Sequence, residues 1–562
     1  RRLTIPSFFD RGPTPVVFGR LGAQGSGSAR AASVDAANEA AAFAQLQSVR
    51  SLLQVEDPDV DNRPAEREEG TIQFLASTVA KMAVLLVCWY LFLVSMDLMS
   101  SSFKLFAGRP TGGTVVQTDV MRSPVVGIMT GLLVTVLVQS SSSSTSITIT
   151  LVGSQLLSVK EAIPIVMGAN LGSSVTSSVA ALSQVTRRDE LQRAFAAATS
   201  HALFNWLTLV VLLPFEVTFA FLESSSKMAV QALDRKDRLL RFNHLHALTR
   251  PLTNFIVQLE DARPQKALDH GHPIPVLSTV RVCCSFNGSY CTRPCRSALA
   301  QLRLGDQGTG LVLLFFSLLL LLGCLSLLAR TLSPALRLHL VVALSRLPKS
   351  FIEGYTCLCL GLLVTLVLQS STAVSSMLTL LSAASGVDLE RVYPLLLGAN
   401  IGTTTTGILA ALAGDPTRDA LQLALCHSFL NVYGALLFYP VPFMRFPLPL
   451  ARLLASTAAQ YRWFALAYLL LLFVSLPVVV LALSFAGTAL FSAIGVPVLL
   501  AALCLLALNV VQKRRPVLLP PFLRTWDWLP LWMHSLVPID LLLERRLLSR
   551  CRVVDAFLGK AP

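Results

Sequence analysis

Long apolar runs alternate with polar interruptions over most of the chain. Several runs reach about 20 residues, the length that a helix needs to cross a hydrocarbon core about 30 Å thick. Plain runs of this kind cover about 74–98, 310–328, 464–483 and 490–511. Two further apolar regions, which begin near Pro124 and Gly354, are broken by clusters of Ser, Thr and Gly. The pattern predicts an all-α polytopic membrane protein.

The two interrupted regions form an internal repeat. Three motifs recur after 230 positions: GLLVT at 131–135 and 361–365, QSS at 139–141 and 369–371, and GAN at 168–170 and 398–400. The offset slips to 226 positions, about one helical turn, for His201 and His427 and for Asn205 and Asn431. Duplicated halves with polar, Gly-interrupted segments are typical of secondary transporters, whose binding site lies between the repeats.

This pattern divides the chain into six parts. They are an N-terminal cytoplasmic tail (1–73), a first span with repeat 1 (74–225), a polar extracellular loop (226–308), a span with repeat 2 (309–445), the C-terminal spans (446–511) and a cytoplasmic tail (512–562). Basic residues after the last span assign the final tail to the cytoplasm. We interpret its Trp-rich stretch as an interfacial amphipathic segment, with a partner site as the alternative.

Composition supports the membrane assignment. The chain is 53% hydrophobic and only 14% charged, against about 25% charged in ordinary soluble domains. Its formal net charge is +14. In a membrane protein such an excess indicates cytoplasmic loops and tails in contact with anionic lipid rather than binding of nucleic acid.

Four cysteines gather in the polar loop, around the chain's one N-x-S/T sequon at Asn287. They are Cys283, Cys284, Cys291 and Cys295. Four close cysteines suit either a zinc knuckle or disulfide bonds. The neighbouring sequon favours an extracellular, glycosylated, disulfide-bonded loop. The spacing leaves the pairing open.

Hydroxyl side chains fill the centre of the first interrupted region, where nine of the twelve residues from Gln139 to Thr150 are Ser or Thr. Small hydroxyl residues also serve close helix packing, but packing rarely needs five consecutive serines. Hydroxyl groups and helix N-termini donate hydrogen bonds to oxyanions. The run therefore predicts a binding site for a small oxyanion such as phosphate.

The interrupted regions contain no charge of their own. No Asp, Glu, Lys or Arg occurs between Ser123 and Val159 or between Gly354 and Val387. An anion held in a low dielectric needs compensating positive charge. Metal cations that bind together with the anion would supply it, and the segments around Asn170 and Asn400 offer the oxygen ligands that sodium accepts.

These motifs resemble the type II sodium-dependent phosphate cotransporters, solute carrier family 34. The resemblance rests on the paired QSS runs, the GAN-[LI]-G-[ST] motif that occurs in both repeats, FNWL followed by LLP, and the cysteine loop between the halves. It covers about 74–550 and implies two inverted repeats with broken, re-entrant helices. It also implies sodium-driven phosphate uptake across the plasma membrane, typically the apical membrane of epithelial cells, with no resident cofactor.

The resemblance also implies two sets of site residues. Phosphate would contact Gln139, Ser140, Ser141, Ser142, Ser143, Gln369, Ser370, Ser371 and Thr372. Sodium would bind at Gln184, Asn205, Asn400, Thr403, Thr404 and Thr406.

Several positions depart from the family's pattern. Ala202 stands where electrogenic members carry an Asp that belongs to an extra sodium site. Since Ala cannot bind sodium, the chain looks most like the electroneutral type IIc subtype. Arg187 replaces a usual Asp, Ala399 a usual Ser, and Thr372 a common Ser. The first two changes would weaken a sodium site, whereas Thr372 keeps its hydroxyl.

Other functions remain as alternatives. The same fold could carry another oxyanion such as sulfate, or conduct anions as a channel through rings of hydroxyl groups. An enzyme is not expected, because His201 and His427 lie in apolar segments without carboxylates nearby in sequence. Besides phosphate, sodium and the lipid bilayer, the candidate partners are scaffold proteins at the tails and a second copy of the chain.

Overall fold

The first QSS motif forms the turn of a helical hairpin. α4 (Pro124–Val138) ends where Gln139 adopts the left-handed backbone conformation, with φ of 56°. α5 (Ser141–Gly153) begins directly afterwards, and its N-cap Ser140 accepts a hydrogen bond from the backbone N–H of Ser143 at 3.2 Å. A left-handed residue commonly ends a helix and a serine N-cap begins one. The motif itself therefore breaks the helix.

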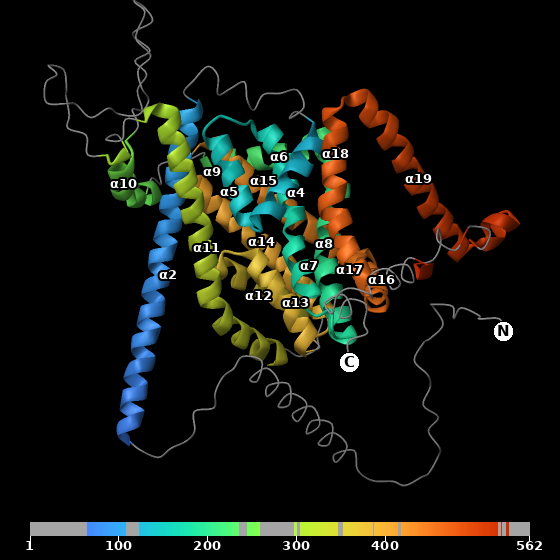
Figure 1. The fold of residues 1–562 in the computed structure, drawn as a ribbon, viewed down its shortest axis with the longest axis horizontal. Coiled ribbons are helices and arrows are strands. Elements are labelled where there is room, and N and C mark those ends of the chain that lie inside the picture. The colour runs from blue at the N-terminus through green and yellow to red at the C-terminus, as the bar shows by residue number, and fades with distance from the viewer. Residues whose placement is uncertain are drawn as a thin grey trace, which may run out of the picture. The chain divides into compact units, whose positions relative to one another are not determined.

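The second QSS motif builds the same turn. α12 (Glu353–Leu368) ends at Gln369, whose φ is 51°, and α13 (Ser371–Ser385) follows. The Ser370 hydroxyl accepts from the backbone N–H of Ala373 at 3.4 Å. In Figure 1 the α4–α5 hairpin lies in the upper half of the bundle and the α12–α13 hairpin in the lower half.

Glycines bring the first hairpin into direct backbone contact with α6 (Val159–Gly172). A Cβ atom on Gly131 would overlap the backbone carbonyl of Ile165, and one on Gly168 would overlap that of Ile128. The GLLVT and GAN motifs therefore meet across a helix pair that only glycine allows to pack this closely.

The second repeat reproduces this packing between α12 and α14 (Leu389–Ala413). A Cβ atom on Gly361 would overlap the carbonyl of Leu395, and one on Gly398 would overlap that of Leu358. Each of these contacts lies 230 positions after its counterpart in the first repeat. The sequence repeat is thus a structural repeat down to individual backbone contacts.

The computed structural model describes residues 64–107, 123–234, 244–258, 297–299, 304–346, 352–385, 387–413, 417–526, 530 and 536–538. All belong to one compact unit, and its described secondary structure is helical. The remaining helices are α2 (Pro64–Ala107), α7 (Ser174–Leu182), α8 (Arg188–Phe219), α9 (Phe221–Asp234), α10 (His244–Ile256), α11 (Gly305–Arg346), α15 (Arg418–Phe438), α16 (Pro447–Gln460), α17 (Arg462–Leu470), α18 (Leu476–Phe485) and α19 (Thr488–Arg514). A π-helical turn, Leu471–Ser475, joins α17 to α18, and short 3₁₀ turns cover Pro442–Met444, Pro516–Leu518 and Pro521–Leu523.

Eight helices in the described part of the chain are long and apolar enough to span a membrane. The spans expected from the sequence near 310–328, 464–483 and 490–511 are confirmed to within a few residues. The first span is Met82–Leu105 rather than 74–98. Both ranges contain Asp97, which is buried and accepts a hydrogen bond from Thr249 of α10 at 2.7 Å.

Several helices run past the boundaries expected from the apolar pattern. The boundary at 73 falls inside α2, that at 225 inside α9, that at 308 inside α11 and that at 511 inside α19. These differences between helix ends and expected boundaries share one cause. Apolar composition marks where a helix lies in hydrocarbon, whereas backbone hydrogen bonding continues the helix into polar sequence.

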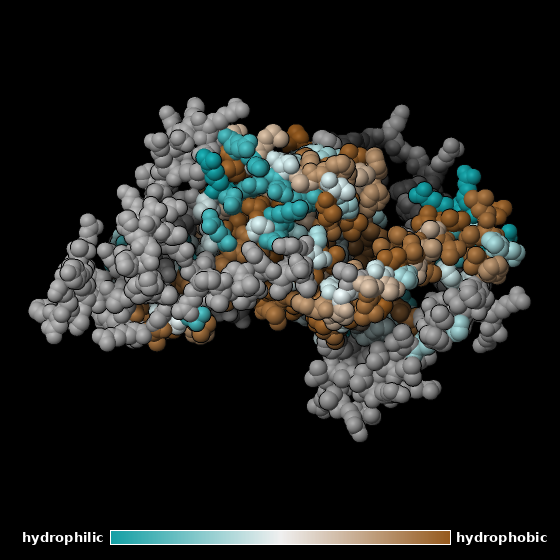
Figure 2. Space-filling view, turned by 90° about the horizontal axis from the view of Figure 1, so that it is seen from above, coloured by the Kyte–Doolittle hydropathy of each residue, from teal (hydrophilic) through white to brown (hydrophobic). Residues whose placement is uncertain are grey.

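The outer surface is apolar over much of its area. Large exposed hydrophobic side chains occur along α8, α11, α17, α18 and α19. Figure 2, which looks onto the upper end of the bundle, shows teal hydrophilic residues gathered over part of this end and brown apolar residues over much of the rest. A surface of this kind suits lipid contact.

We predict that the glycine contacts limit stability. Gly398→Ala adds a methyl group against the Leu358 carbonyl, and such overpacking should lower the free energy of unfolding by about 1–3 kcal/mol. Thermal loss of the monodisperse peak in detergent measures this change. Gly323→Ala on α11 is the control, because a Cβ there meets nothing within 4 Å. Equal melting temperatures for the two variants would contradict the prediction.

Candidate functional site

The two QSS turns, which lie far apart in sequence, meet inside the bundle. The Ser141 and Ser371 hydroxyl oxygens are 3.3 Å apart, and Ser142 donates to the backbone carbonyl of Gln369 at 3.4 Å. Ser141 and Ser371 are equivalent positions of the repeat. The N-termini of α5 and α13 therefore face each other.

A cavity of about 300 Å³ opens between the two turns. Its polar lining comes from both repeats and consists of Gln139, Ser140, Ser143, Thr176, Ser370, Thr372 and Ser376. Leu322 and Leu325 of α11 close another side with apolar atoms. None of the described lining residues is charged.

Backbone donors add to this hydroxyl lining. The first N–H groups of an α-helix have no partner within the helix. The N-caps Ser140 and Ser370 use one such group in each helix, which leaves the earlier N–H groups of α5 and α13 available. Two helix N-termini also bring two partial positive charges to one place. The arrangement can bind a small anion without a charged side chain.

The two motif glutamines are oriented in the same way. Gln139 donates to the Val136 carbonyl at 2.5 Å and its Oε1 accepts from Thr176 at 3.2 Å. Gln369 donates to the Leu366 carbonyl at 2.5 Å and its Oε1 accepts from Thr406 at 3.0 Å. Each hairpin tip is thereby tied to the threonine six positions after the asparagine of the GAN motif in its own repeat.

Buried amides form a network beside the hairpins. The Asn205 Oδ1 atom accepts from Asn400 at 2.9 Å and from Asn170 at 3.3 Å, and Asn170 also donates to Asn431 at 3.1 Å. His201 Nε2 lies 2.8 Å from Asn400 Oδ1 and donates to it. All five side chains are buried. The network joins helices of both repeats through neutral groups.

The threonines expected to bind sodium lie on α14 next to this network. Thr403 donates to the Ala399 carbonyl at 2.8 Å and Thr404 to the Ile401 carbonyl at 2.7 Å. Both hydroxyl oxygens keep lone pairs that can accept. Ala399, the departure noted in the sequence, is buried in an apolar cluster and its side chain adds no oxygen.

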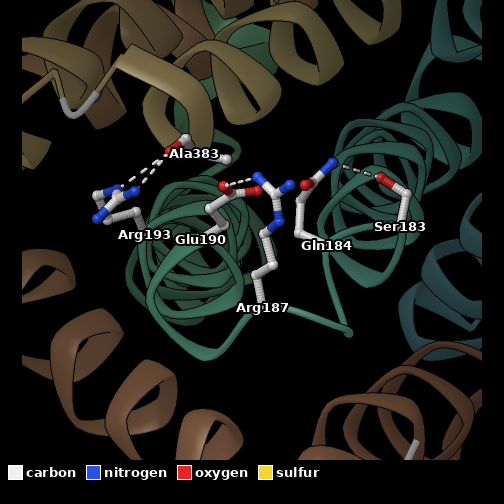
Figure 3. A network of polar contacts seen from close by, with 6 residues as sticks. All are labelled: Ser183, Gln184, Arg187, Glu190, Arg193 and Ala383. Carbon is white, nitrogen blue, oxygen red and sulfur yellow. Dashed lines mark hydrogen bonds and ion pairs between the residues drawn. The ribbon is translucent and has the colours of Figure 1, made fainter. Parts of the chain in front are cut away.

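Gln184 lies apart from the amide network, in the turn between α7 and α8. It donates to Ser183 at 3.0 Å (Figure 3). Nearby Arg187 is largely exposed and pairs with Glu190 at 2.7 Å. This hydrogen bond raises the pKa of the Arg187 guanidinium above its ordinary value, so the group stays charged. The structure thus brings Asn205 and Asn400 together and places Thr406 against Gln369, but it leaves Gln184 in the turn near the exposed Arg187.

Position 202 is fully buried among apolar side chains. Ala202 packs against Val175 of α7 and against Phe473 of the π-helical turn, with Tyr468 at the edge of this cluster. Val175 and Phe473 offer no oxygen ligand, whereas Tyr468 carries a buried hydroxyl group. The cysteines at 283, 284, 291 and 295 and the sequon at Asn287 lie outside the described residues.

Sequence reasoning missed two polar residues of the cavity lining, Thr176 and Ser376. The repeat offset of 230 contained the signal, because Thr176 is the counterpart of Thr406 and Ser376 that of Ser146 within the serine run. Applying the offset to every hydroxyl residue near a motif would have found both.

Comparison with known proteins agrees with this geometry. The model of the family Na+/Pi-cotransporter matches residues 91–230 and 319–445, which contain both hairpins. The chain is 38% identical to sodium-dependent phosphate transport protein 2B of Pongo abelii over 522 residues, covering 85% of this chain and 76% of the relative. It is 38% identical to protein 2A of Ovis aries over 516 residues, covering 86% and 81%.

Human sodium-dependent phosphate transport protein 2B is 37% identical over 527 residues, covering 86% of this chain and 76% of the relative. No solved structure matches the chain. These relatives are transport proteins, and the chain is a multi-pass membrane protein rather than an enzyme. The identity and coverage show that the chain belongs to the Na+/Pi-cotransporter family.

Proposed function

We propose that the chain is a sodium-coupled symporter that takes inorganic phosphate into the cell. The observation that carries this proposal is the meeting of the α5 and α13 N-termini at an uncharged, hydroxyl-lined cavity. Phosphate presents four oxygens, three or more of which accept hydrogen bonds. The hydroxyl groups, the free backbone N–H groups and the helix dipoles meet these requirements from two sides.

Sodium completes the charge balance of this site. A phosphate anion next to neutral groups alone is costly in a low dielectric, and the described lining of the cavity has no cation. Thr406, a proposed sodium ligand, is hydrogen-bonded to Gln369 of the phosphate motif. A sodium ion at Thr406 would therefore act directly on the orientation of Gln369, which supports coupled binding.

Alternating access follows from two inverted repeats. The hairpins occupy opposite halves of the bundle and their tips meet (Figure 1). Equivalent glycine contacts pack each hairpin on its own partner helix. Two like units around one shared site can open it to one end or the other by rocking against each other.

Transport is electroneutral in this proposal, as in the type IIc subtype. Support comes from Ala202, which is buried beside Val175 and Phe473 where no oxygen ligand from these residues is available. An additional sodium ion would have no carboxylate there. From the resemblance to the family we also propose that the protein acts in the plasma membrane, at the apical surface of epithelial cells, with both tails in the cytoplasm.

Uptake measurements test the function. We expect radiolabelled phosphate to enter cells that express the chain only when sodium is present, and arsenate but not sulfate to compete. Replacement of sodium by choline is the control. Uptake that persists in choline would favour an anion channel, and competition by sulfate would favour a less selective oxyanion transporter.

A substitution at the hairpin tips tests the phosphate site. Ser141→Leu places a branched side chain where the Ser141 and Ser371 oxygens lie 3.3 Å apart, so it should separate the two tips and abolish uptake. Ser492→Leu on the exposed face of α19 is the matched control. Surface biotinylation shows whether both variants reach the membrane. Normal uptake by a surface-expressed Ser141→Leu variant would refute the assignment.

Substitutions at position 202 test electroneutrality. Ala202→Asp alone should reduce uptake, because the carboxylate is buried against Phe473. Combined with Phe473→Ser, which supplies space and a hydroxyl group, it should produce a phosphate-dependent inward current. Ala202→Asn with Phe473→Ser matches the volume without the charge and should pass no current. Current in the unmodified protein would contradict the proposal.

A further inference from the structure

Arg193 of α8 caps the far end of the helix that begins at the second QSS motif. Its Nε and Nη2 atoms donate to the backbone carbonyl of Ala383 at 3.1 and 2.8 Å. Figure 3 shows the guanidinium pointing at this carbonyl, while Arg187 and Glu190 pair with each other on the same helix. The function proposed above makes no use of this contact.

The contact lies where a cation stabilises a helix. Ala383 is close to the C-terminus of α13, where the last four carbonyls have no partner within the helix. The negative end of the helix dipole lies there too. Arg193 therefore satisfies a buried carbonyl and complements the dipole, and its two donors fix the direction of approach.

α13, which Arg193 caps at its C-terminal end, contributes to the anion site at its N-terminal end. α13 has 15 residues and is about 22 Å long at 1.5 Å per residue. Its N-terminus presents Ser371 to the opposite hairpin and Thr372 to the cavity. A shift or tilt of its C-terminal end must move these groups, because a helix of this length moves as a rod.

The seam between α13 and α8 around Ala383 is one part of the contact between these helices, since Leu378 and Leu381 of α13 also share an apolar cluster with Ala197 of α8. Its buried members are largely alanines, among them Ala194, Ala198 and Ala455. Alanines allow close approach but contribute little apolar area each. A second cavity of about 380 Å³ adjoins the seam and is lined by Arg193 itself, by Ser382 and by Glu390. Arg193 thus has a polar space into which it can turn.

The second repeat has no arginine at the position equivalent to Arg193. The position 230 residues after Arg193 is Leu423, and the position equivalent to Ala383 is Gly153. The end of α5 is instead followed by Ser154, which donates to the Thr150 carbonyl of its own helix at 2.9 Å. The capping contact between α8 and α13 breaks the symmetry of the repeats.

We propose that Arg193 is a positioning residue for transport. Its contact with Ala383 holds α13 on α8 in the arrangement described here and breaks when the second hairpin moves to open the phosphate site at this end of the bundle. The contact thereby sets both the position of Ser371 and Thr372 and the ease of opening. This inference rests on the proposed function, which supplies the phosphate site and the sodium and phosphate used in the tests below.

Site-resolved labelling of a cysteine at the seam tests the opening directly. In the full-length chain in proteoliposomes, Ser382→Cys lines the second cavity and reports its access to a maleimide, read by mass spectrometry of the peptide that contains it. We expect saturating sodium and phosphate to change the labelling rate in the parent variant. Adding Arg193→Gln should raise the labelling rate roughly tenfold, because the variant loses a charge-assisted pair of hydrogen bonds. It should also make the labelling rate independent of phosphate.

Two matched variants separate positioning from general damage. Arg193→Lys keeps the charge at the helix end without the two-donor fork, so its labelling rate should lie between those of the parent and Arg193→Gln. Arg188→Gln removes an exposed arginine from the first turn of the same helix and should match the parent. Equal labelling in the parent and in a monodisperse Arg193→Gln variant would overturn the proposal.

Uptake measurements link the contact to transport. Arg193→Gln should raise the apparent KM for phosphate several-fold in cells, with Arg188→Gln unchanged. A changed labelling rate together with an unchanged KM would overturn the role in positioning Ser371 and Thr372. Lack of sodium-dependent uptake in the unmodified protein, despite the labelling changes, would instead refute the proposed function.

Discussion

The structure depends on two helix N-termini that face each other in a region without charged side chains. The partial positive charges of α5 and α13 repel each other when their first residues are as close as Ser141 and Ser371. An anion between the helices turns this repulsion into attraction on both sides. The hydroxyl groups that cap the two helices and line the cavity serve the same purpose, because they donate hydrogen bonds without adding net charge. A lysine or arginine at this place would bind phosphate tightly and release it slowly, whereas dipoles combined with a mobile cation allow both binding and release.

Holding the two tips together requires close packing behind them. The contacts of Gly131 and Gly168, and of Gly361 and Gly398, place each hairpin backbone directly on its partner helix. The hydrogen bond of Gln369 to Thr406 then fixes the turn itself. Packing thus sets the distance between the hairpins, and the glutamines set the orientation of their tips. The amide network around Asn205 joins these two units through groups that can exchange partners without moving a charge through the membrane.

The repeat and the composition of the motifs made much of this site predictable from the sequence. The 230-residue offset indicated that the two QSS runs are equivalent, and their lack of charge indicated a neutral oxyanion site. The offset could not show that Ser141 and Ser371 touch, because contact between repeats depends on packing. It also could not place Gln184, whose surroundings are set by where α7 ends and α8 begins. The Arg193 contact was hidden for another reason: its acceptor is a backbone carbonyl, which no residue pattern marks.

The two repeats differ most in the hydrogen bonds that α8 makes to the other repeat. The slip from 230 to 226 positions moves His201 and Asn205 by about one turn relative to their counterparts on α15. Asn205 accepts from Asn400 of the second repeat, and its counterpart Asn431 accepts from Asn170 of the first. The histidines differ, because His201 bonds to Asn400 whereas neither ring nitrogen of His427 has a hydrogen-bond partner. Arg193, two turns earlier on the same helix, holds Ala383 of the second hairpin. α8 of the first repeat therefore contacts the second repeat at two places along its length, at the buried amide network and at the C-terminal end of α13. Strict symmetry would make opening at either end of the bundle equally easy. The contacts of His201 and Arg193, which have no counterpart on α15, remove that equality. The direction in which the site opens therefore depends on whether the second hairpin is held on α8 or released from it.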